Sequence, residues 1–234
     1  VWVGGIALAL GGIFLVRYTI EAGLIGPGMR IILGGLLALA LVGLGEFTRR
    51  REILAGFARF NTAHIPSVLT AAGTTVAYAV IYAAFALYNF LSPGLAFLLL
   101  GAVALATLAA ALLHGPALAG LGLVGAFVTP ALIGSTQPNY WALYLYLAVV
   151  TAAAFLLARV RLWRWLAITA AVFSLVWLIL PLGAGGEMYP QIVYLLVGFA
   201  LALALIASGV LFGPDMGRGR LDLLSSGVLG VYLL

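Results

Sequence analysis

Long, nearly unbroken runs of apolar residues follow one another along the whole chain, separated by short stretches that are polar or rich in Gly and Pro. A helix needs about 20 apolar residues to cross the hydrocarbon core of a bilayer, and these runs have that length. A transmembrane β-barrel would instead show alternating apolar and polar positions in segments of about ten residues. The pattern therefore predicts an all-α fold, a polytopic bundle of transmembrane helices.

We predict about nine membrane segments, which form a single transmembrane region over residues 1–234. The last segment is cut short, and the first residue already lies in an apolar run, so we expect the chain to be an excerpt of a longer protein. The fifth segment is short, Gly-rich and contains Pro130, so it either spans the bilayer or re-enters it. The predicted segments are Val1–Ile20, Met29–Phe47, Ser67–Phe90, Pro93–Leu113, Pro116–Ile133, Asn139–Ala158, Trp163–Leu180, Pro190–Phe212 and Leu221–Leu234.

The composition agrees with a membrane location. Hydrophobic residues make up 65% of the chain and charged residues 7%, whereas a soluble globular protein carries about a quarter charged residues. The absence of Cys excludes disulfides and thiolate metal sites within this sequence. The net charge of +5 comes from arginines in short loops between apolar runs, so it does not indicate a nucleic-acid partner.

The arginines lie in every second loop, which predicts the orientation. Cytoplasmic loops of membrane proteins carry an excess of basic residues, so we expect the N-terminus of this sequence to be cytoplasmic. The segment Glu52–Ile65 is too polar to span and is either an interfacial amphipathic turn or an ordinary cytoplasmic loop. Only Arg17 and Arg30 lie on the outer side, while the inner side holds Arg49, Arg50, Arg51, Arg59, Arg159, Arg161, Arg164, Arg218 and Arg220.

Three sequence segments carry a resemblance to a known family. Tyr18–Arg30 reads YTIEAGLIGPGMR, Val76–Tyr88 reads VAYAVIYAAFALY, and Leu121–Leu132 reads LGLVGAFVTPAL, with Gly45-Glu46 and an Arg cluster between the first two. The chain resembles the bacterial predicted-membrane-protein family called domain of unknown function 2339, in order over roughly the first 140 residues and more loosely beyond. The resemblance implies a many-helix protein of the bacterial inner membrane, and it implies no activity, substrate or cofactor.

The first candidate site is a charged cluster of Arg17, Glu21 and Arg30. Arg17 and Glu21 are four residues apart and share one helix face, and the Gly-Pro turn at Gly26–Gly28 folds Arg30 back toward them. An ionisable residue at membrane depth is a functional-site hypothesis by default. The cluster either binds an anionic headgroup or envelope substrate, or is an ion pair that anchors the first hairpin.

The second candidate is a polar and aromatic stripe on the third helix. Thr74, Tyr78, Tyr82 and Asn89 recur there near helical spacing, with Thr75 beside them, in a segment otherwise rich in Ala and Val. Such a stripe faces the bundle interior more readily than lipid. It serves either interhelical hydrogen bonds or contacts with a substrate.

Other features favour packing over chemistry. Glycines in several helices let their neighbours approach closely, and Thr129-Pro130 is a point where the fifth helix kinks or breaks. His64 and His114 have no second ligand at metal-binding spacing, so we expect neither a metal nor a cofactor. The packing glycines are Gly4, Gly5, Gly11, Gly12, Gly34, Gly35, Gly120, Gly122 and Gly125.

Three classes of function remain open from the sequence. Transport or flipping of a cell-envelope molecule ranks first, because many Gly-rich helices enclose a few polar groups. A membrane-embedded transferase acting on a lipid-linked substrate is the alternative, with Glu21 as its acid or base. A non-catalytic structural membrane protein is the third class. The expected partners are membrane lipid and a lipid-linked or anionic envelope substrate.

Overall fold

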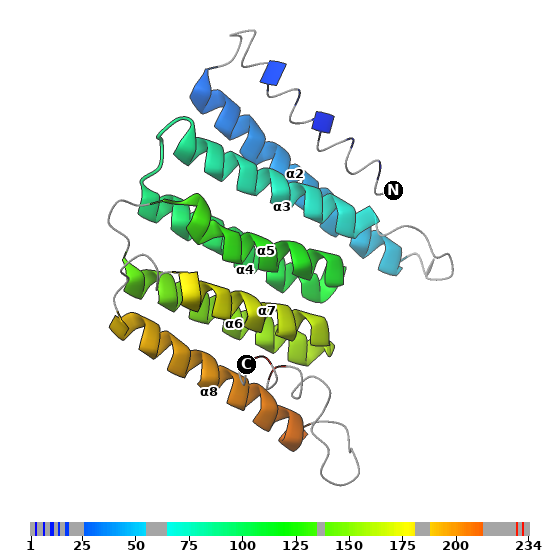
Figure 1. Ribbon diagram of the computed structural model, residues 1–234. Coiled ribbons are helices and arrows are strands. Elements are labelled where there is room, and N and C mark those ends of the chain that lie inside the picture. The colour runs from blue at the N-terminus through cyan, green and yellow to red at the C-terminus, as the bar shows by residue number, and fades with distance from the viewer. Residues whose placement is uncertain are drawn as a thin grey trace. The chain divides into compact units, whose positions relative to one another are not determined.

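The computed structural model is all-helical in the part of the chain that it describes, which is residues 26–54, 65–134, 139–180 and 188–212, with single residues near both ends (Figure 1). Those single residues are Val3, Ala7, Leu10, Gly11, Phe14, Arg17, Tyr18, Val228 and Val231, and all of them are helical. The helices are α2 (Pro27–Leu54), α3 (Ile65–Ala86), α4 (Pro93–His114), α5 (Pro116–Leu132), α6 (Tyr140–Arg161), α7 (Arg164–Ile179) and α8 (Met188–Phe212).

These seven helices correspond in order to the second through eighth predicted segments. Two boundaries differ clearly from prediction. Helix α2 continues to Leu54, so the first residues of the stretch predicted as a turn or loop are helical, while residues 55–64 lie outside the described part. Helix α3 ends at Ala86, four residues before the predicted end. The first and last predicted segments fall mostly outside the described residues.

Five of the described helices are long and apolar enough to cross a membrane: Pro27–Arg51 within α2, then α3, α4 and α6, and Met188–Leu205 within α8. Helices α5 and α7 have 17 and 16 residues. At 1.5 Å per residue they are about 24–26 Å long, somewhat less than the roughly 30 Å hydrocarbon core. The prediction of a transmembrane helix bundle is confirmed at this coarser level, and about nine crossings stays a prediction.

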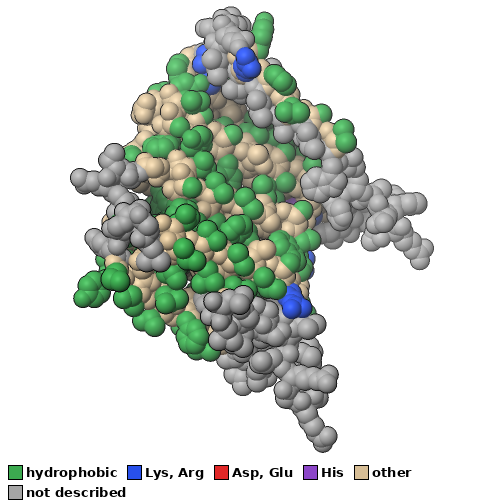
Figure 2. All heavy atoms as spheres, viewed as in Figure 1, with side chains coloured by type: hydrophobic (Ala, Val, Ile, Leu, Met, Phe, Trp, Pro, Cys, Tyr) green, Lys and Arg blue, Asp and Glu red, His purple; other side chains and the backbone are tan. Residues whose placement is uncertain are grey.

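The outer surface of the helices is apolar. Large hydrophobic side chains such as Leu39, Leu98, Leu145 and Leu196 are exposed, and Figure 2 shows hydrophobic side chains spread over the visible face. An exposed apolar surface of this kind is unfavourable in water and matches hydrocarbon chains. The surface is therefore suited to lipid.

The chain divides into two compact units, residues 1–125 and 126–234, and the division falls within α5. In the first unit, α2 and α3 lie side by side (Figure 1). Glycines set their separation. A Cβ atom at Gly73 of α3 would lie 2.9 Å from the Ala38 carbonyl oxygen and from the Val42 nitrogen of α2. A Cβ atom at Gly45 of α2 would lie 3.0 Å from the Pro66 oxygen and still closer to the Thr70 hydroxyl.

Several of the predicted packing glycines make such contacts. Gly34 faces Val80 across the α2–α3 interface, and Gly122 of α5 lies against the Leu108 backbone of α4, where a Cβ would be 2.9 Å from the Leu108 nitrogen. By contrast, Gly11 and Gly35 have open space where a Cβ would stand. The sequence analysis missed Gly45 and Gly73, although these two bring α2 and α3 closest together.

In the second unit, α6 packs against both α7 and α8. The buried positions recur every three or four residues on each helix, so each helix presents one stripe to its neighbours. On α8 this stripe begins with Pro190 and Gln191 and continues through Tyr194, Gly198 and Ala202. The first part of the stripe is polar, which places polar side chains inside an otherwise apolar unit.

The glycine contacts give a first prediction. Gly73→Ala should lower the free energy of unfolding in detergent by about 1–3 kcal/mol, because the new methyl group meets the α2 backbone, which cannot move aside like a side chain. Gly43→Ala is the matched control, since nothing lies within 4 Å of its Cβ position and Ala is the better helix former. Thermal unfolding of both variants measures the difference. Equal midpoints would contradict close α2–α3 packing at Gly73.

Candidate functional site

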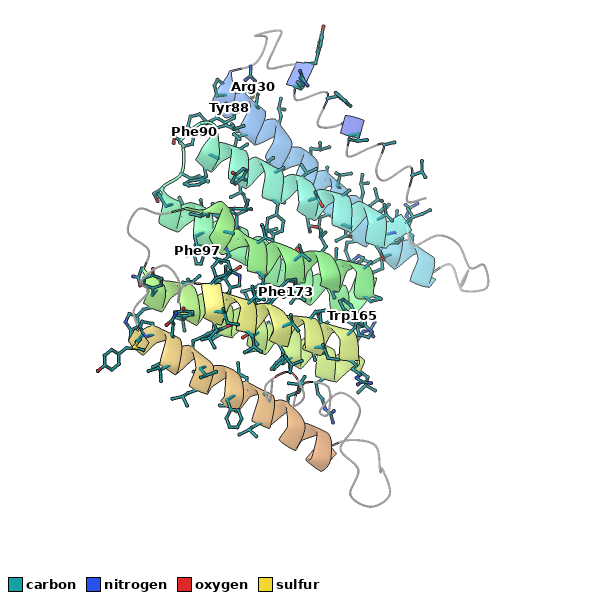
Figure 3. The ribbon with its side chains drawn as sticks, viewed as in Figure 1. Arg30, Tyr88, Phe90, Phe97, Trp165 and Phe173 are labelled. Atoms are coloured by element: carbon teal, nitrogen blue, oxygen red, sulfur yellow. The ribbon has the colours of Figure 1, made fainter. Side chains whose placement is uncertain are left out.

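An arginine and two aromatic residues gather at one end of the first unit (Figure 3). Arg30 stands in the first turn of α2, where its backbone nitrogen donates to the Gly26 oxygen at 3.2 Å. Its half-buried side chain donates from a terminal guanidinium nitrogen to the Tyr88 hydroxyl at 3.4 Å. The Tyr88 ring stacks on Phe90 with a centroid distance of 5.6 Å. The cation is thus held beside an aromatic pair at the helix end.

The turn after α3 brings Tyr88 and Phe90 together. The Tyr88 nitrogen donates to the Ala83 oxygen at 3.1 Å, and the Phe90 nitrogen donates to the Ala84 oxygen at 2.8 Å. Between them Asn89 has a positive φ of 52°, a left-handed conformation that Asn tolerates better than most residues. Ser92 then accepts from the Leu95 nitrogen at 3.4 Å and caps α4. This tight closure ends α3 at Ala86.

The early end of α3 corrects one sequence prediction. Asn89 does not continue the helical stripe, because it lies in the turn and is exposed. Thr74 is buried, but its hydroxyl donates to the Ala71 oxygen of its own helix at 3.0 Å. The Tyr78 ring reaches Gly125 on α5, while Tyr82 is 37% exposed. The stripe thus separates into an inward part, Thr74 and Tyr78, and an exposed part, Tyr82 and Asn89. A role of these residues in binding stays a prediction.

The predicted charged cluster is only partly within the described residues. Arg17 is helical and exposed, and Arg30 is half-buried. Glu21 lies outside the described residues, so the proximity of Glu21 to either arginine stays a prediction. The partner that sequence analysis missed is Tyr88, which is 58 residues from Arg30 in the chain. No local spacing signals a contact of that sequence separation.

The opposite end of α2 is strongly basic. Glu46 accepts from Arg49 through both carboxylate oxygens, at 2.7 and 2.6 Å, and from Arg50 at 2.8 Å. The Arg51 guanidinium lies 4.4 Å from the centroid of the Phe47 ring. One carboxylate therefore faces two arginines, and a third arginine lies over an aromatic ring. This end of α2 carries a surplus of positive charge.

Pro130 lies within α5 without ending it. A proline has no N–H group, so the carbonyl four residues earlier, that of Ala126, receives no bond from position 130. The Tyr146 hydroxyl of α6 donates to this Ala126 oxygen at 2.8 Å. The Trp177 indole of α7 donates to the next carbonyl, that of Phe127, at 2.9 Å. Side chains of α6 and α7 thus donate hydrogen bonds to the α5 backbone carbonyls next to the proline. The helix stays continuous to Leu132.

A buried polar group lies among α6, α7 and α8, and sequence analysis did not single it out. The Ser174 and Tyr194 hydroxyls are 2.7 Å apart, and the Tyr194 ring stacks on Tyr144 with a centroid distance of 5.0 Å. Gln191, one turn before Tyr194, is 5% exposed. The sequence signal was the Gln191–Tyr194 spacing of three residues, which puts both on one face of an apolar helix.

The chain matches one described protein family over nearly its whole length. The model of the family described as "Predicted membrane protein (DUF2339)" matches residues 1–232. The chain belongs to this family. The match extends well beyond the first 140 residues that carried most of the resemblance. The chain matches no curated protein and no solved structure, so the family contributes a membrane location and no reaction.

The hydrogen bond to the proline-freed carbonyl gives a second prediction. Tyr146→Phe removes the donor to the buried Ala126 oxygen and should lower stability by about 1–3 kcal/mol. In a Pro130→Ala background the restored N–H can satisfy that oxygen, so the same Tyr146→Phe change should cost clearly less. A double-mutant cycle of thermal unfolding measures the coupling. Additive effects would show that the Tyr146 contact does not compensate for Pro130.

Proposed function

We propose that this protein is a bacterial inner-membrane transporter or flippase that binds the anionic part of a cell-envelope molecule at the Arg30 end of the first unit. The observation that carries this proposal is the placement of Arg30. Its guanidinium is half-buried at the first turn of α2 and bonded to Tyr88. It lies at the opposite end of α2 from Arg49, Arg50 and Arg51.

Electrostatics favour an anion at this position. The N-terminal end of a helix carries the equivalent of about half a positive charge, so a cation there is disfavoured and an anion is attracted. Arg30 adds a full positive charge to that end. Its planar guanidinium suits bidentate binding of phosphate or carboxylate. We propose that Arg17 and Glu21 complete this site, with Glu21 orienting the arginines until an anionic substrate arrives.

The proposed topology has nine crossings with a cytoplasmic N-terminus. Its support is the distribution of basic residues in the described helices. Arg49, Arg50 and Arg51 end α2, while Arg159 and Arg161 end α6 and Arg164 begins α7. Basic residues at one set of helix ends are typical of the cytoplasmic side. Arg30 then belongs to the outer side, where it meets the outer leaflet.

The transferase alternative has less support among the described side chains. A transferase needs an acid or base near its substrate. Glu46 is the only carboxylate whose side chain the structure describes, and Arg49 and Arg50 hold it at the basic end of α2. An enzyme would depend on a carboxylate whose side chain the structure does not describe, such as Glu21. A transporter needs no such group, so transport remains the better proposal.

The topology is the third prediction. The protein has no native cysteine, so single cysteines at Ala55, Ser135 and Gly185 can be labelled without background. We expect position 55 to be protected from an impermeant thiol reagent added to intact cells, and positions 135 and 185 to react. The reverse pattern would overturn the orientation, and equal labelling of all three would overturn the alternation of the crossings.

The fourth prediction tests Arg30 in the cell. A deletion strain should accumulate a lipid-linked envelope intermediate on one leaflet, and wild-type protein should restore the distribution. Arg30→Gln should lower this activity by roughly 10- to 100-fold, which corresponds to loss of a charge-assisted hydrogen bond of about 1.5–3 kcal/mol. Arg30→Lys should rescue poorly, because the fork geometry is lost.

Arg50→Gln is the matched control, because Arg50 is 73% exposed at the opposite end of α2. This variant should insert and function like the wild type. Full activity of a well-inserted Arg30→Gln variant would contradict the proposed anion-binding site. Loss of an envelope modification in the deletion strain, in place of a leaflet imbalance, would favour the transferase.

A further inference from the structure

We propose that the turn between α6 and α7 binds the phosphate of an anionic membrane lipid through Arg161 and Arg164. Such a site goes beyond the proposed function, because it lies in the second unit and holds a lipid that stays bound to the protein. The charge of this unit is distributed unevenly. Residues 139–180, which include both helices, contain Arg159, Arg161 and Arg164 and no other charged residue. The turn therefore concentrates positive charge on an otherwise uncharged pair of helices.

The two arginines of the site face each other across a short turn. Arg161 is the last residue of α6 and Arg164 is the first residue of α7, and Leu162 closes the turn in the left-handed conformation with a φ of 56°. Helix α6 has 22 residues and a length of about 33 Å. This length matches the roughly 30 Å hydrocarbon core, so a spanning α6 places both arginines at the level of the lipid headgroups.

Both side chains are accessible. Arg161 and Arg164 are exposed, and in the part of the chain that the structure describes neither of them forms an ion pair. The basic end of α2 differs in this respect, because Glu46 there binds both Arg49 and Arg50. The charge at the α6–α7 turn is thus available to an anion that approaches from the membrane.

A contact with Trp163 orients one of the arginines. The central carbon of the Arg161 guanidinium lies 5.4 Å from the centroid of the Trp163 ring, a cation–π contact. Trp163 is fixed through its backbone, because its nitrogen donates to the Ala158 oxygen at 3.0 Å and its oxygen accepts from the Leu166 nitrogen at 3.1 Å. The ring positions the guanidinium, which keeps N–H donors for phosphate oxygens.

The surroundings of the arginines indicate a lipid as the source of the phosphate. Val160 and Leu162 flank Arg161 and are exposed, Trp165 at the start of α7 is also exposed (Figure 3), and the exposed Leu156 lies one turn further into α6. An anionic lipid carries a phosphate beside acyl chains, so it matches both the charged and the apolar side chains. A soluble anion or an acidic protein segment matches only the arginines. Basic residues next to a membrane helix also attract anionic lipids generally.

The test titrates the full chain in neutral detergent with phosphatidylglycerol or with phosphatidylcholine, and native mass spectrometry measures the bound lipid. We expect wild-type protein to bind phosphatidylglycerol more tightly. Arg161→Gln and Arg164→Gln should each weaken this binding about fivefold, the equivalent of about 1 kcal/mol for one arginine near a membrane surface. Each variant retains Arg30, so a lipid held at Arg30 does not contribute to the difference from wild type. Equal binding of phosphatidylglycerol by both variants and the wild type would overturn the proposal.

Two control variants separate a defined site from general attraction by positive charge. Arg50→Gln should bind phosphatidylglycerol nearly like the wild type, because Arg50 is exposed but Glu46 already offsets its charge. Arg161→Lys should restore only part of the binding that Arg161→Gln loses, because lysine keeps the charge and loses the planar fork. Full binding by Arg161→Lys would show a diffuse attraction and contradict a defined site at the turn.

Two soluble ligands test the assignment to lipid. The proposal fails if phosphatidylglycerol binds no more tightly than phosphatidylcholine while glycerol 3-phosphate raises the unfolding temperature of wild-type protein but not of Arg161→Gln, because the ligand is then a free phosphate. The same result with a polyglutamate peptide would assign the turn to an acidic protein and would also overturn it. Without lipid, Arg161→Gln should unfold at the wild-type temperature, since its side chain is exposed.

Discussion

The constraint on which the structure depends is the lack of water in the hydrocarbon core, because every backbone and side-chain polar group there must find its partner within the protein. Helices satisfy their own backbones, and buried hydroxyls turn back onto them. Thr70, Thr107 and Thr151 each donate to the carbonyl four residues earlier, at 2.9, 2.6 and 2.8 Å. The same constraint accounts for Tyr146 at the carbonyl that Pro130 leaves without a donor. In the described helices, polar side chains thus serve mainly to complete the helices that carry them or their neighbours.

Self-contained helices must then associate without a hydrophobic driving force, because lipid tails are as apolar as their side chains. Close approach supplies the missing attraction through dispersion, which falls off steeply with distance. Gly45 and Gly73 provide this for α2 and α3, where the helix backbones nearly touch. Gly122 provides it for α5 against α4. These glycines therefore act as packing residues, and the conformational freedom of glycine plays no part at these positions.

The coarse fold was readable from sequence because run length and apolar content decide it, and the seven described helices follow the predicted order. Finer features depend on contacts that no window of sequence contains. The end of α3 at Ala86 follows from the left-handed Asn89 and the Tyr88–Phe90 turn. Hydropathy alone predicts a helix that extends to Phe90. Arg30 was recognised as a candidate, but its partner Tyr88 comes from the far end of α3. Gln191, Tyr194 and Ser174 each read as an isolated polar residue in an apolar run, and only the packing of α7 and α8 with α6 makes them a group.

The Arg30 end of the first unit and the buried polar group of the second unit use polarity in opposite ways. Arg30 is a half-buried cation at a helix end, where a charge is less costly than in the middle of a membrane helix. Tyr144 and Gln191 lie equally near the starts of their helices but are buried, where an unscreened charge would be costly, and both side chains are neutral. A neutral polar group can be buried between helices without the desolvation cost of an ion. The polar side chains buried in the described helices are therefore neutral, and the arginines of α2, α6 and α7 lie near helix ends.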